Sequence, residues 1–508
     1  MSPAPTGPIE KAAQALQAGA NISLQDKIAS LRSLSVSLGE NVSISQATQV
    51  FQVLPLADLY GAFSVEDDEL TDAACALISK LLGPFSYDMV VATNEEFLLQ
   101  GLSHFTPAIR CLSLEQVEKC VVSNSSVISM VNSQVFPLVL TTLAFQDIRT
   151  ASKASGVLQK VALTEPGLEA FTSGISPMML QQLVYIDGTV SFRIYELVVD
   201  VASSSENAFK KCESSGLLSI IHTQISSNDL LLRINAIEIL HKLALKSGIE
   251  FLEKNNILQE LSVLLSQEYD TDVVLVLTKC AIIKFFANLS ESRDVEFGVI
   301  EQKHGIFERL SKCLYSTNNE VLTTAASCVG IIGSSVTGLG LILSSSLLGV
   351  FIEGYHSSGG ETKTVFLRSL SKILGIQDES NPVVETMTEN VYNLVNGRST
   401  TLDELIKMAK QPMEDSRIAV FSVMQSISSH SWGQKLLSQS TEFIEFILNR
   451  AAETTQSGQT WKYGIVKNLV ASPDSASNLG QNYTLLQQYI RQGPFYQPSE
   501  TAVAVGNI

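Results

Sequence analysis

The sequence predicts an all-α protein built as a right-handed solenoid of armadillo/HEAT-like helical repeats. Three observations support this fold class. A segment of about forty residues recurs through the middle of the chain, its apolar residues follow the period of a helix, and the alternation typical of strands is scarce. One such unit cannot bury its apolar face alone, so neighbouring units stack and share one elongated core.

Each copy of the repeat opens with a small or polar residue followed by aliphatic residues. The copies read GISPMMLQQL, GLLSIIHTQI, NILQELSVLL and GIFERLSKCL, and they begin at Gly174, Gly216, Asn256 and Gly305. A second apolar helix closes the repeat, and these closing segments begin at Arg193, Asn235 and Ala281. Two or more helices per unit at this period are typical of armadillo and HEAT arrays.

The closing helix after Ala281 shows the helical period most clearly. Its apolar residues stand at positions i, i+3, i+4 and i+7, namely Ile282, Phe285, Phe286 and Leu289. This spacing places four large side chains on one face of a helix, where they can be buried against the neighbouring repeat.

The predicted organisation is one long solenoid with short ends. We expect residues 1–20 to be disordered or loosely ordered, because the first residues are rich in proline and small side chains. The solenoid covers 21–496, with atypical capping repeats over about 21–110, the clearest repeats over about 120–350 and C-terminal repeats over about 360–496. Residues 497–508 are expected to form a flexible tail. Within the C-terminal repeats, Thr401 and Glu404 have the spacing of a helix capping box.

The charge balance excludes general nucleic-acid binding. The 508-residue chain carries 51 acidic and 34 basic residues, a net charge of −17, and such a chain repels phosphate backbones. One uncharged run, 321–352, is long enough to span a bilayer, but glycines and serines interrupt it, and it keeps the register of the repeats. We therefore expect no membrane segment.

The seven cysteines indicate a reducing compartment. Their number is odd, they are widely spaced and no C-x-x-C motif occurs. Free cysteines in apolar helices behave as small hydrophobic residues. The expected location is the cytoplasm, with the nucleus as a further compartment.

No motif in the sequence points to an enzyme. The six histidines form no pair with another His or Cys at the spacing of metal ligands, and there is no P-loop and no nucleophile elbow. We therefore predict no catalytic, metal-binding or cofactor-binding residues.

Polar residues of the closing helices form a candidate protein-binding face. Aligning the three closing helices puts Glu196, Glu238 and Lys284 in one column. Asp200, Lys242 and Asn288 form a second column on the same face, and Arg193 and Asn235 extend the stripe by one turn. Asn288 stands where armadillo repeats often carry an asparagine that binds a partner backbone. The alternative interpretation is an ordinary solvated helix face held by local pairs.

Four segments resemble the family of proteasome base assembly chaperones. They are GLEAF (167–171), SFRIYELV (191–198), SWGQKLL (431–437) and QNYTLLQQYIRQGPFY (481–496). The resemblance runs from about residue 130 to the end in consistent order and is weak over the first hundred or so residues. These are packing motifs, and they fix no contact residue.

The resemblance implies a non-catalytic chaperone. Such a solenoid cradles the C-terminal domain of one AAA ATPase of the proteasome base, regulatory subunit 7. Through that ATPase it meets a neighbouring ATPase and a large non-ATPase base subunit, and it leaves before the mature 26S proteasome forms. No cofactor, nucleic acid or membrane is implied, and we expect the free chain to be a monomer.

A second interpretation is a general armadillo-type adaptor for peptides or proteins, in nuclear transport or as a scaffold. Such adaptors carry a ladder of Trp and Asn residues along the groove. This chain has only two tryptophans, Trp432 and Trp461, and both lie outside the clearest repeats. The sequence therefore favours the assembly chaperone.

Overall fold

The computed structural model describes residues 7–17, 22–225, 227, 229–266, 273–376, 382–396, 400–471 and 475–496. Throughout these ranges the ordered elements are helices, and no β-strand occurs. The predicted all-α class is confirmed. The chain divides into two compact units, unit 1 (Met1–Ala236) and unit 2 (Ile237–Ile508), and each is described by itself.

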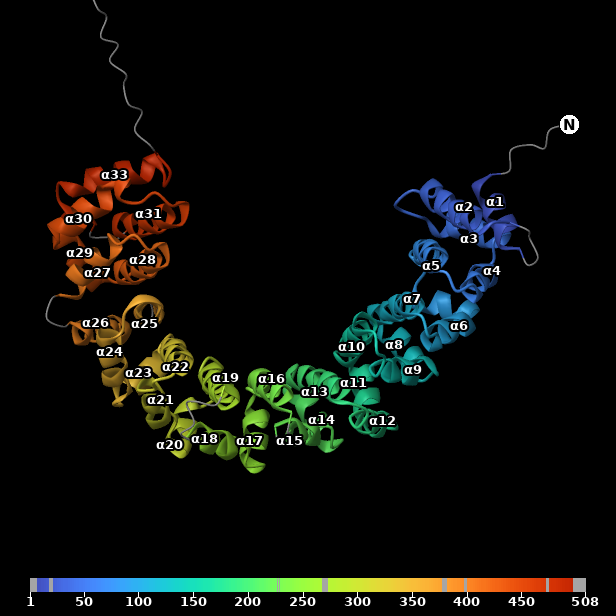
Figure 1. Ribbon diagram of the computed structural model, residues 1–508, viewed down its shortest axis with the longest axis horizontal. Helices are drawn as coiled ribbons and strands as arrows, with labels where there is room; N and C mark the ends of the chain where they lie inside the picture. Colours follow the sequence, from blue (N-terminus) through green and yellow to red (C-terminus); the bar gives the residue numbers. More distant parts are fainter. Residues whose placement is uncertain are drawn as a thin grey trace, which may run out of the picture. The chain divides into compact units, whose positions relative to one another are not determined.

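Unit 1 is a series of short helices (Figure 1). Their bounds are α1 (Pro8–Leu16), α2 (Leu24–Ser37), α3 (Ile44–Val53), α4 (Leu56–Gly61), η1 (Ala62–Ser64), α5 (Asp68–Leu82), α6 (Tyr87–Ser103), α7 (Pro107–Glu118), η2 (Lys119–Val122), α8 (Asn124–Val131), α9 (Val135–Thr142), α10 (Ile148–Ala162), α11 (Glu165–Thr172), α12 (Ser176–Leu183), α13 (Gly188–Ser203), α14 (Glu206–Ser214) and α15 (Ser219–Ile225). Helix α16 (Leu230–Leu240) contributes residues to both units.

Unit 2 continues in the same style. Its elements are η3 (His241–Leu243), α17 (Lys246–Lys254), α18 (Ile257–Leu265), α19 (Val273–Leu289), α20 (Phe297–His304), α21 (Ile306–Leu314), α22 (Asn319–Ile332), α23 (Val336–Leu343), α24 (Leu347–Ser357), α25 (Gly360–Leu374), α26 (Val383–Val395), α27 (Thr401–Ala409), α28 (Glu414–Ser428), α29 (Ser431–Gln439), α30 (Thr441–Leu448), η4 (Arg450–Ala452), α31 (Gln456–Ala471), α32 (Ser475–Leu479) and α33 (Asn482–Gln492).

One helix of each repeat packs against its counterpart in the next repeat. We call these the closing helices: α5, α7, α10 and α13 in unit 1, and α19, α22, α25, α28 and α31 in unit 2. Consecutive closing helices contact each other within each unit. In Figure 1 the closing helices of unit 2 lie along the inner side of that unit's curve. This stacking extends the core along the chain, as the repeat predicts.

The residues that open the predicted repeats all adopt left-handed backbone. The φ angles are +63° at Gly174, +77° at Gly216, +59° at Asn256 and +59° at Gly305. Each residue ends one helix and turns the chain into the next, which is the common use of Gly or Asn after a helix C-terminus. The small opening residue is therefore a requirement of the turn, and Asn256 shows that asparagine also satisfies it.

A second group of glycines sits where the chain turns sharply after a closing helix or, at Gly248, after η3. A Cβ at Gly167 would lie 2.0 Å from the carbonyl oxygen of Val161. The same approach recurs at Gly248 and Gly338, with 2.1 Å to the oxygen of Leu243 and 1.9 Å to that of Ile332. The first helix of the next repeat can pack this close to the closing helix only without a side chain at this position.

The predicted apolar stripe of α19 forms part of the core. Ile282, Phe285, Phe286 and Leu289 are all buried, and the rings of Phe285 and Phe286 meet edge to face with centroids 5.1 Å apart. The closing segments predicted from Arg193 and Asn235 lie in α13 and in α16 with η3. The helix predicted to be capped at Thr401 begins there, but the side chain of Thr400 accepts the capping hydrogen bond from Asp403, one residue earlier than expected.

The start of the chain corrects one prediction. Within the segment expected to be loosely ordered, 1–20, residues 8–16 form helix α1. Pro8 occupies the first turn, where its missing N–H is tolerated, and Ala12, Ala13 and Ala15 are buried, with α1 packed on α2. Residues 1–6 and 18–20 lie outside the described residues, as does the predicted tail over 497–508.

Candidate protein-binding surface

The stripe predicted from the sequence lies on α13, on α16 with η3, and on α19. In unit 1, the buried hydroxyl of Tyr195 on α13 donates to the carbonyl oxygen of Ala236 on α16 at 2.7 Å. Because a buried hydroxyl without a partner is costly, this bond fixes the two helices against each other. The two parts of the stripe are considered separately below, one in each unit.

In unit 1 the predicted residues differ in their availability to a partner. Glu196 and Asn235 are exposed to solvent. Asp200 is half-buried and accepts a hydrogen bond from Gln159 on α10 at 3.3 Å. Arg193 is half-buried and donates to the carbonyl oxygen of Leu143. Burial lowers the pKa of the Arg193 guanidinium below its usual value.

The position of Arg193 has a structural cause. Leu143 follows the last residue of α9, where helix carbonyls have no partner within the helix. The guanidinium of Arg193 donates a hydrogen bond to this carbonyl, which lies about one repeat earlier in the sequence. Arg193 therefore holds adjacent repeats together, and within unit 1 the side chains on the stripe that a partner can reach most directly are Glu196 and Asn235.

In unit 2, two residues of the first predicted column lie next to each other. Lys284 on α19 and Glu238 on α16 form an ion pair at 3.5 Å, with half of each side chain exposed. Lys242 lies on η3 and is exposed, and Asn288 on α19 is half-buried. These residues form a surface of mixed charge. Glu238 and Lys284 can break their mutual ion pair and bond to a partner instead.

The sequence prediction missed polar contacts between other closing helices. In unit 1, Glu115 on α7 accepts from Ser79 on α5 at 3.1 Å and pairs with Lys153 on α10 at 2.6 Å. In unit 2, the hydroxyls of Ser371 on α25 and Ser426 on α28 lie 3.0 Å apart. These pairs are separated by about one repeat in the sequence. An alignment of the closing helices that includes the weaker repeats would bring these residues into register.

The cysteines offer no activated nucleophile at four of their positions. Burial raises the pKa of Cys75, Cys120, Cys212 and Cys328 to about 12 in each case. Since the thiolate is the reactive form, these thiols are protonated and inert at neutral pH. Among the described residues, no group of three or more His, Cys, Asp or Glu side chains is placed to hold a metal ion.

The uncharged run in the middle of unit 2 forms two helices with a sharp bend. In the described part of the chain, no single helix is long and apolar enough to cross a membrane. Helices α22 and α23 together meet the length and composition of a span, but they are bent by 118°.

Comparison with solved structures identifies a similar helical-repeat architecture. A structure of Kap95p with RanGDP is 12% identical over 96% of this chain and 64% of that chain, with a TM-score of 0.57. A complex of Kap95 with Nup1 is 13% identical over 96% of this chain and 66% of that chain, with a TM-score of 0.58. At this level of identity the likeness establishes the fold alone.

Comparison with protein sequences is more specific. Proteins named 26S proteasome non-ATPase regulatory subunit 5 match over almost their whole length. The protein from Bos taurus is 25% identical over 97% of this chain and 99% of its own length. The proteins from Homo sapiens and Drosophila melanogaster are 25% and 22% identical, over 95% and 89% of this chain and 96% and 87% of their own lengths. The model of the family described as "Proteasome non-ATPase 26S subunit" matches residues 10–507, so the chain belongs to that family.

Proposed function

We propose that this chain is a non-catalytic chaperone for assembly of the base of the 26S proteasome regulatory particle. It binds the C-terminal domain of one AAA ATPase, regulatory subunit 7, and is released before the mature proteasome forms. The observation that carries this proposal is the family match over residues 10–507, which coincides with a helical-repeat fold made for binding proteins. The choice of partner rests on the resemblance of the repeat segments to base assembly chaperones.

The proposed mechanism is complementarity of shape and charge together with steric exclusion. In unit 1, the exposed Glu196 and Asn235 contact the ATPase domain. In unit 2, Glu238 and Lys284 exchange their mutual ion pair for contacts with it. The occupied ATPase surface cannot dock prematurely on the core particle, while its free face pairs with a neighbouring ATPase and a large non-ATPase base subunit. Hydrolysis, a metal ion and a cofactor have no part in this mechanism.

The proposal also specifies the compartment in which the chain acts and its oligomeric state before it binds the ATPase. The chain acts in the cytoplasm and also in the nucleus, where reduced cysteines are stable. It is a monomer until it meets the ATPase. Its net charge of −17 keeps the free chain soluble and favours partners with basic patches.

Co-expression with the isolated C-terminal domain of each base ATPase tests the proposal. We expect a stable one-to-one complex with the domain of regulatory subunit 7 and with no other, measured by size-exclusion chromatography with light scattering. Co-elution with none of the domains would contradict the chaperone assignment. It would leave a general adaptor, whose partner a pull-down would then have to identify.

The surface is tested by reversing two charges on the stripe. Glu196→Lys combined with Glu238→Lys should weaken binding of the ATPase domain about tenfold, because the new ammonium groups repel the basic groups that the carboxylates attract. The matched control is Glu40→Lys with Glu66→Lys, which makes the same charge change at two exposed loop positions in unit 1. Equal affinities for the two double variants would remove Glu196 and Glu238 from the interface.

A further inference from the structure

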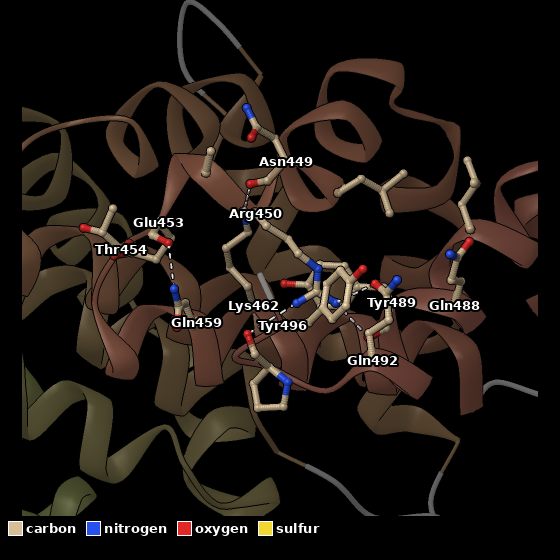
Figure 2. Close-up of a pocket in the computed structure, with 14 residues that line it drawn as sticks. Asn449, Arg450, Glu453, Thr454, Gln459, Lys462, Gln488, Tyr489, Gln492 and Tyr496 are labelled. Atoms are coloured by element: carbon tan, nitrogen blue, oxygen red, sulfur yellow. Dashed lines mark hydrogen bonds between the residues drawn. The ribbon is translucent and has the colours of Figure 1, made fainter. Parts of the chain in front are cut away.

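A pocket of about 730 Å³ lies among the last helices of unit 2, between α30, η4, α31 and α33 (Figure 2). Its size falls in the range of about 300–1,000 Å³ that is usual for ligand sites. It is separate from the stripe on α16 and α19. No sequence motif indicates this pocket.

Lys462 on α31 places a buried ammonium at this pocket. The side chain is 1% exposed, and its Nζ donates to the carbonyl oxygens of Phe446 at 3.1 Å and Asn449 at 2.8 Å. Burial lowers the pKa of Lys462 to about 8, so the group still carries its charge at neutral pH. An ammonium has three N–H donors, and two are used. Among the described residues, the third has no hydrogen-bond acceptor, and the ammonium also lies 4.8 Å from the centroid of the Phe446 ring.

Arg450 on η4 adds a second positive charge. Its two terminal nitrogens donate to the carbonyl oxygens of Tyr489 and Gly493, both at 2.9 Å. The guanidinium lies over the ring of Tyr489, 3.7 Å from the ring centroid. Within the described chain, the Nε–H of Arg450 has no hydrogen-bond acceptor, so Arg450 also keeps one donor for a ligand.

The carboxylate that lines the pocket is already neutralised. Glu453 receives bonds from Nε and Nη2 of Arg417 at 2.8 and 3.1 Å and from Thr455. The positive charges of Lys462 and Arg450 are opposed by the C-terminal ends of the helices whose carbonyl oxygens they bind. Each such helix end is equivalent to about half a negative charge. The pocket is therefore net positive, although the chain as a whole carries −17.

The remaining lining fits a polypeptide. Four amide side chains line the pocket. Gln459 donates to the carbonyl oxygen of Glu453 at 3.1 Å and Gln492 accepts from Arg450 at 3.4 Å, while Asn449 and Gln488 can both donate to and accept from peptide groups. Leu485, 49% exposed at the rim, and Tyr489 provide an apolar wall. Two unused N–H donors match the two oxygens of one carboxylate. A phosphate group carries three acceptor oxygens, more than these two donors can satisfy, so the donor count favours a carboxylate.

We propose that this pocket binds an extended segment of a partner protein through one Glu or Asp side chain. The carboxylate accepts from Lys462 and Arg450, the flanking main chain bonds to the amides, and an adjacent apolar side chain lies on Leu485 and Tyr489. This proposal goes beyond the proposed function, because it does not depend on which protein supplies the segment.

Two pools of end-blocked heptapeptides test the site. The pools share randomised outer positions and apolar residues beside the centre, and they differ only in a central Glu or Gln. With the full chain immobilised, we expect the Glu pool to be retained at least about tenfold better, because a charged hydrogen bond is lost with Gln. Lys462→Met should reduce retention of the Glu pool to the level of the Gln pool. Lys467→Met, at an exposed lysine of the same helix, should leave it unchanged.

Hydrogen exchange will show whether Lys462→Met disturbs the last helices. If it does, a variant at the rim of the pocket still tests the proposal. Leu485→Ser changes an exposed side chain and should reduce retention of the Glu pool by about threefold or more through loss of apolar contact. Equal retention of the two pools, or full retention by Leu485→Ser, would overturn the proposal. Displacement of the Glu pool by an equal concentration of inorganic phosphate would also overturn it, in favour of a phosphate site.

Discussion

The ion pairs that join repeats in unit 1 are exposed, whereas unit 2 encloses several of its charges. In unit 1, Lys153 and Glu115 pair at 2.6 Å with 27% and 41% of their side chains exposed. In unit 2, Arg417 and Glu453 pair at 2.8 Å with only 9% and 1% exposed. Buried charges require partners, while exposed charges can turn to water.

This difference changes what a charge does for the fold. An exposed pair gains little, because water replaces either partner when the pair breaks. A buried pair gains little against an apolar pair of the same shape, but the loss of one partner leaves an uncompensated charge in the interior. Lys363, which is buried and pairs with Glu404 at 3.1 Å, extends this arrangement to α25 and α27. Unit 2 should therefore be far more sensitive than unit 1 to the loss of single charges.

The largest expected effect is at Arg417. Arg417→Met should lower the free energy of local unfolding of α28 and α31 by about 3–5 kcal/mol, because Glu453 loses its counter-charge in the interior. Hydrogen exchange resolved by mass spectrometry measures this locally, which suits a chain too long for two-state unfolding.

The double variant Arg417→Met with Glu453→Met is the control for this prediction. It removes both charges and should recover most of the lost stability. If the single variant costs less than the roughly 1 kcal/mol of an exposed pair, the contrast between the two units is wrong.

The pH dependence of unit 2 follows from the same pair. Burial raises the pKa of Glu453, but hydrogen bonds from Arg417 and Thr455 outweigh it, and the pKa falls to about 2 from an ordinary 4.5. The folded pKa is depressed, so the stabilisation is fully present above about pH 4.5 and is lost as the pH falls toward 2. The amount is on the order of 3 kcal/mol.

Hydrogen exchange of α28 and α31 between about pH 5 and pH 3, corrected for intrinsic exchange rates, should show this loss. In Arg417→Met with Glu453→Met, the same helices should lose much less protection over that range. Equal losses in the two proteins would assign the acid sensitivity to other groups.

The sequence predicted what depends on local pattern. The helical class, the positions where the repeats open (Gly174, Gly216, Asn256 and Gly305) and the buried stripe of α19 follow from spacing, and the left-handed backbone found at those four positions agrees with the preference of Gly and Asn. These features need no knowledge of distant neighbours, because a left-handed turn or an apolar face is encoded within a few residues.

What the sequence did not predict depends on partners in other helices. Arg193 was assigned to an open face, but its acceptor, the carbonyl of Leu143, becomes visible only when repeats stack. Lys462 resembles a surface lysine until α30 supplies carbonyls to it. Helix α1 is short, and it depends on packing against α2, α3 and α4, which its sequence alone does not show.

A smaller effect is expected at the tight turns. Gly167→Ala should destabilise α10 and α11 by about 1–3 kcal/mol, since its Cβ would lie 2.0 Å from the carbonyl oxygen of Val161. Gly156→Ala is the matched control within α10, where a Cβ meets nothing within 4 Å. It should stabilise the helix by about 0.5–1 kcal/mol. Hydrogen exchange should therefore show weaker protection of these helices in Gly167→Ala and stronger protection in Gly156→Ala. Weaker protection in both variants would show that the close approach to Val161 is not the cause.

The smallest effect is expected at the exposed pair of unit 1. Lys153→Met should change the stability of α7 and α10 by less than about 1 kcal/mol, because Glu115 can turn to water and to the hydroxyl of Ser79. The same hydrogen-exchange measurement should show an even smaller difference in high salt, which screens exposed charges. A loss as large as that of Arg417→Met, insensitive to salt, would mean that unit 1 also depends on its charges. The two units would then differ in exposure without differing in what holds their repeats together.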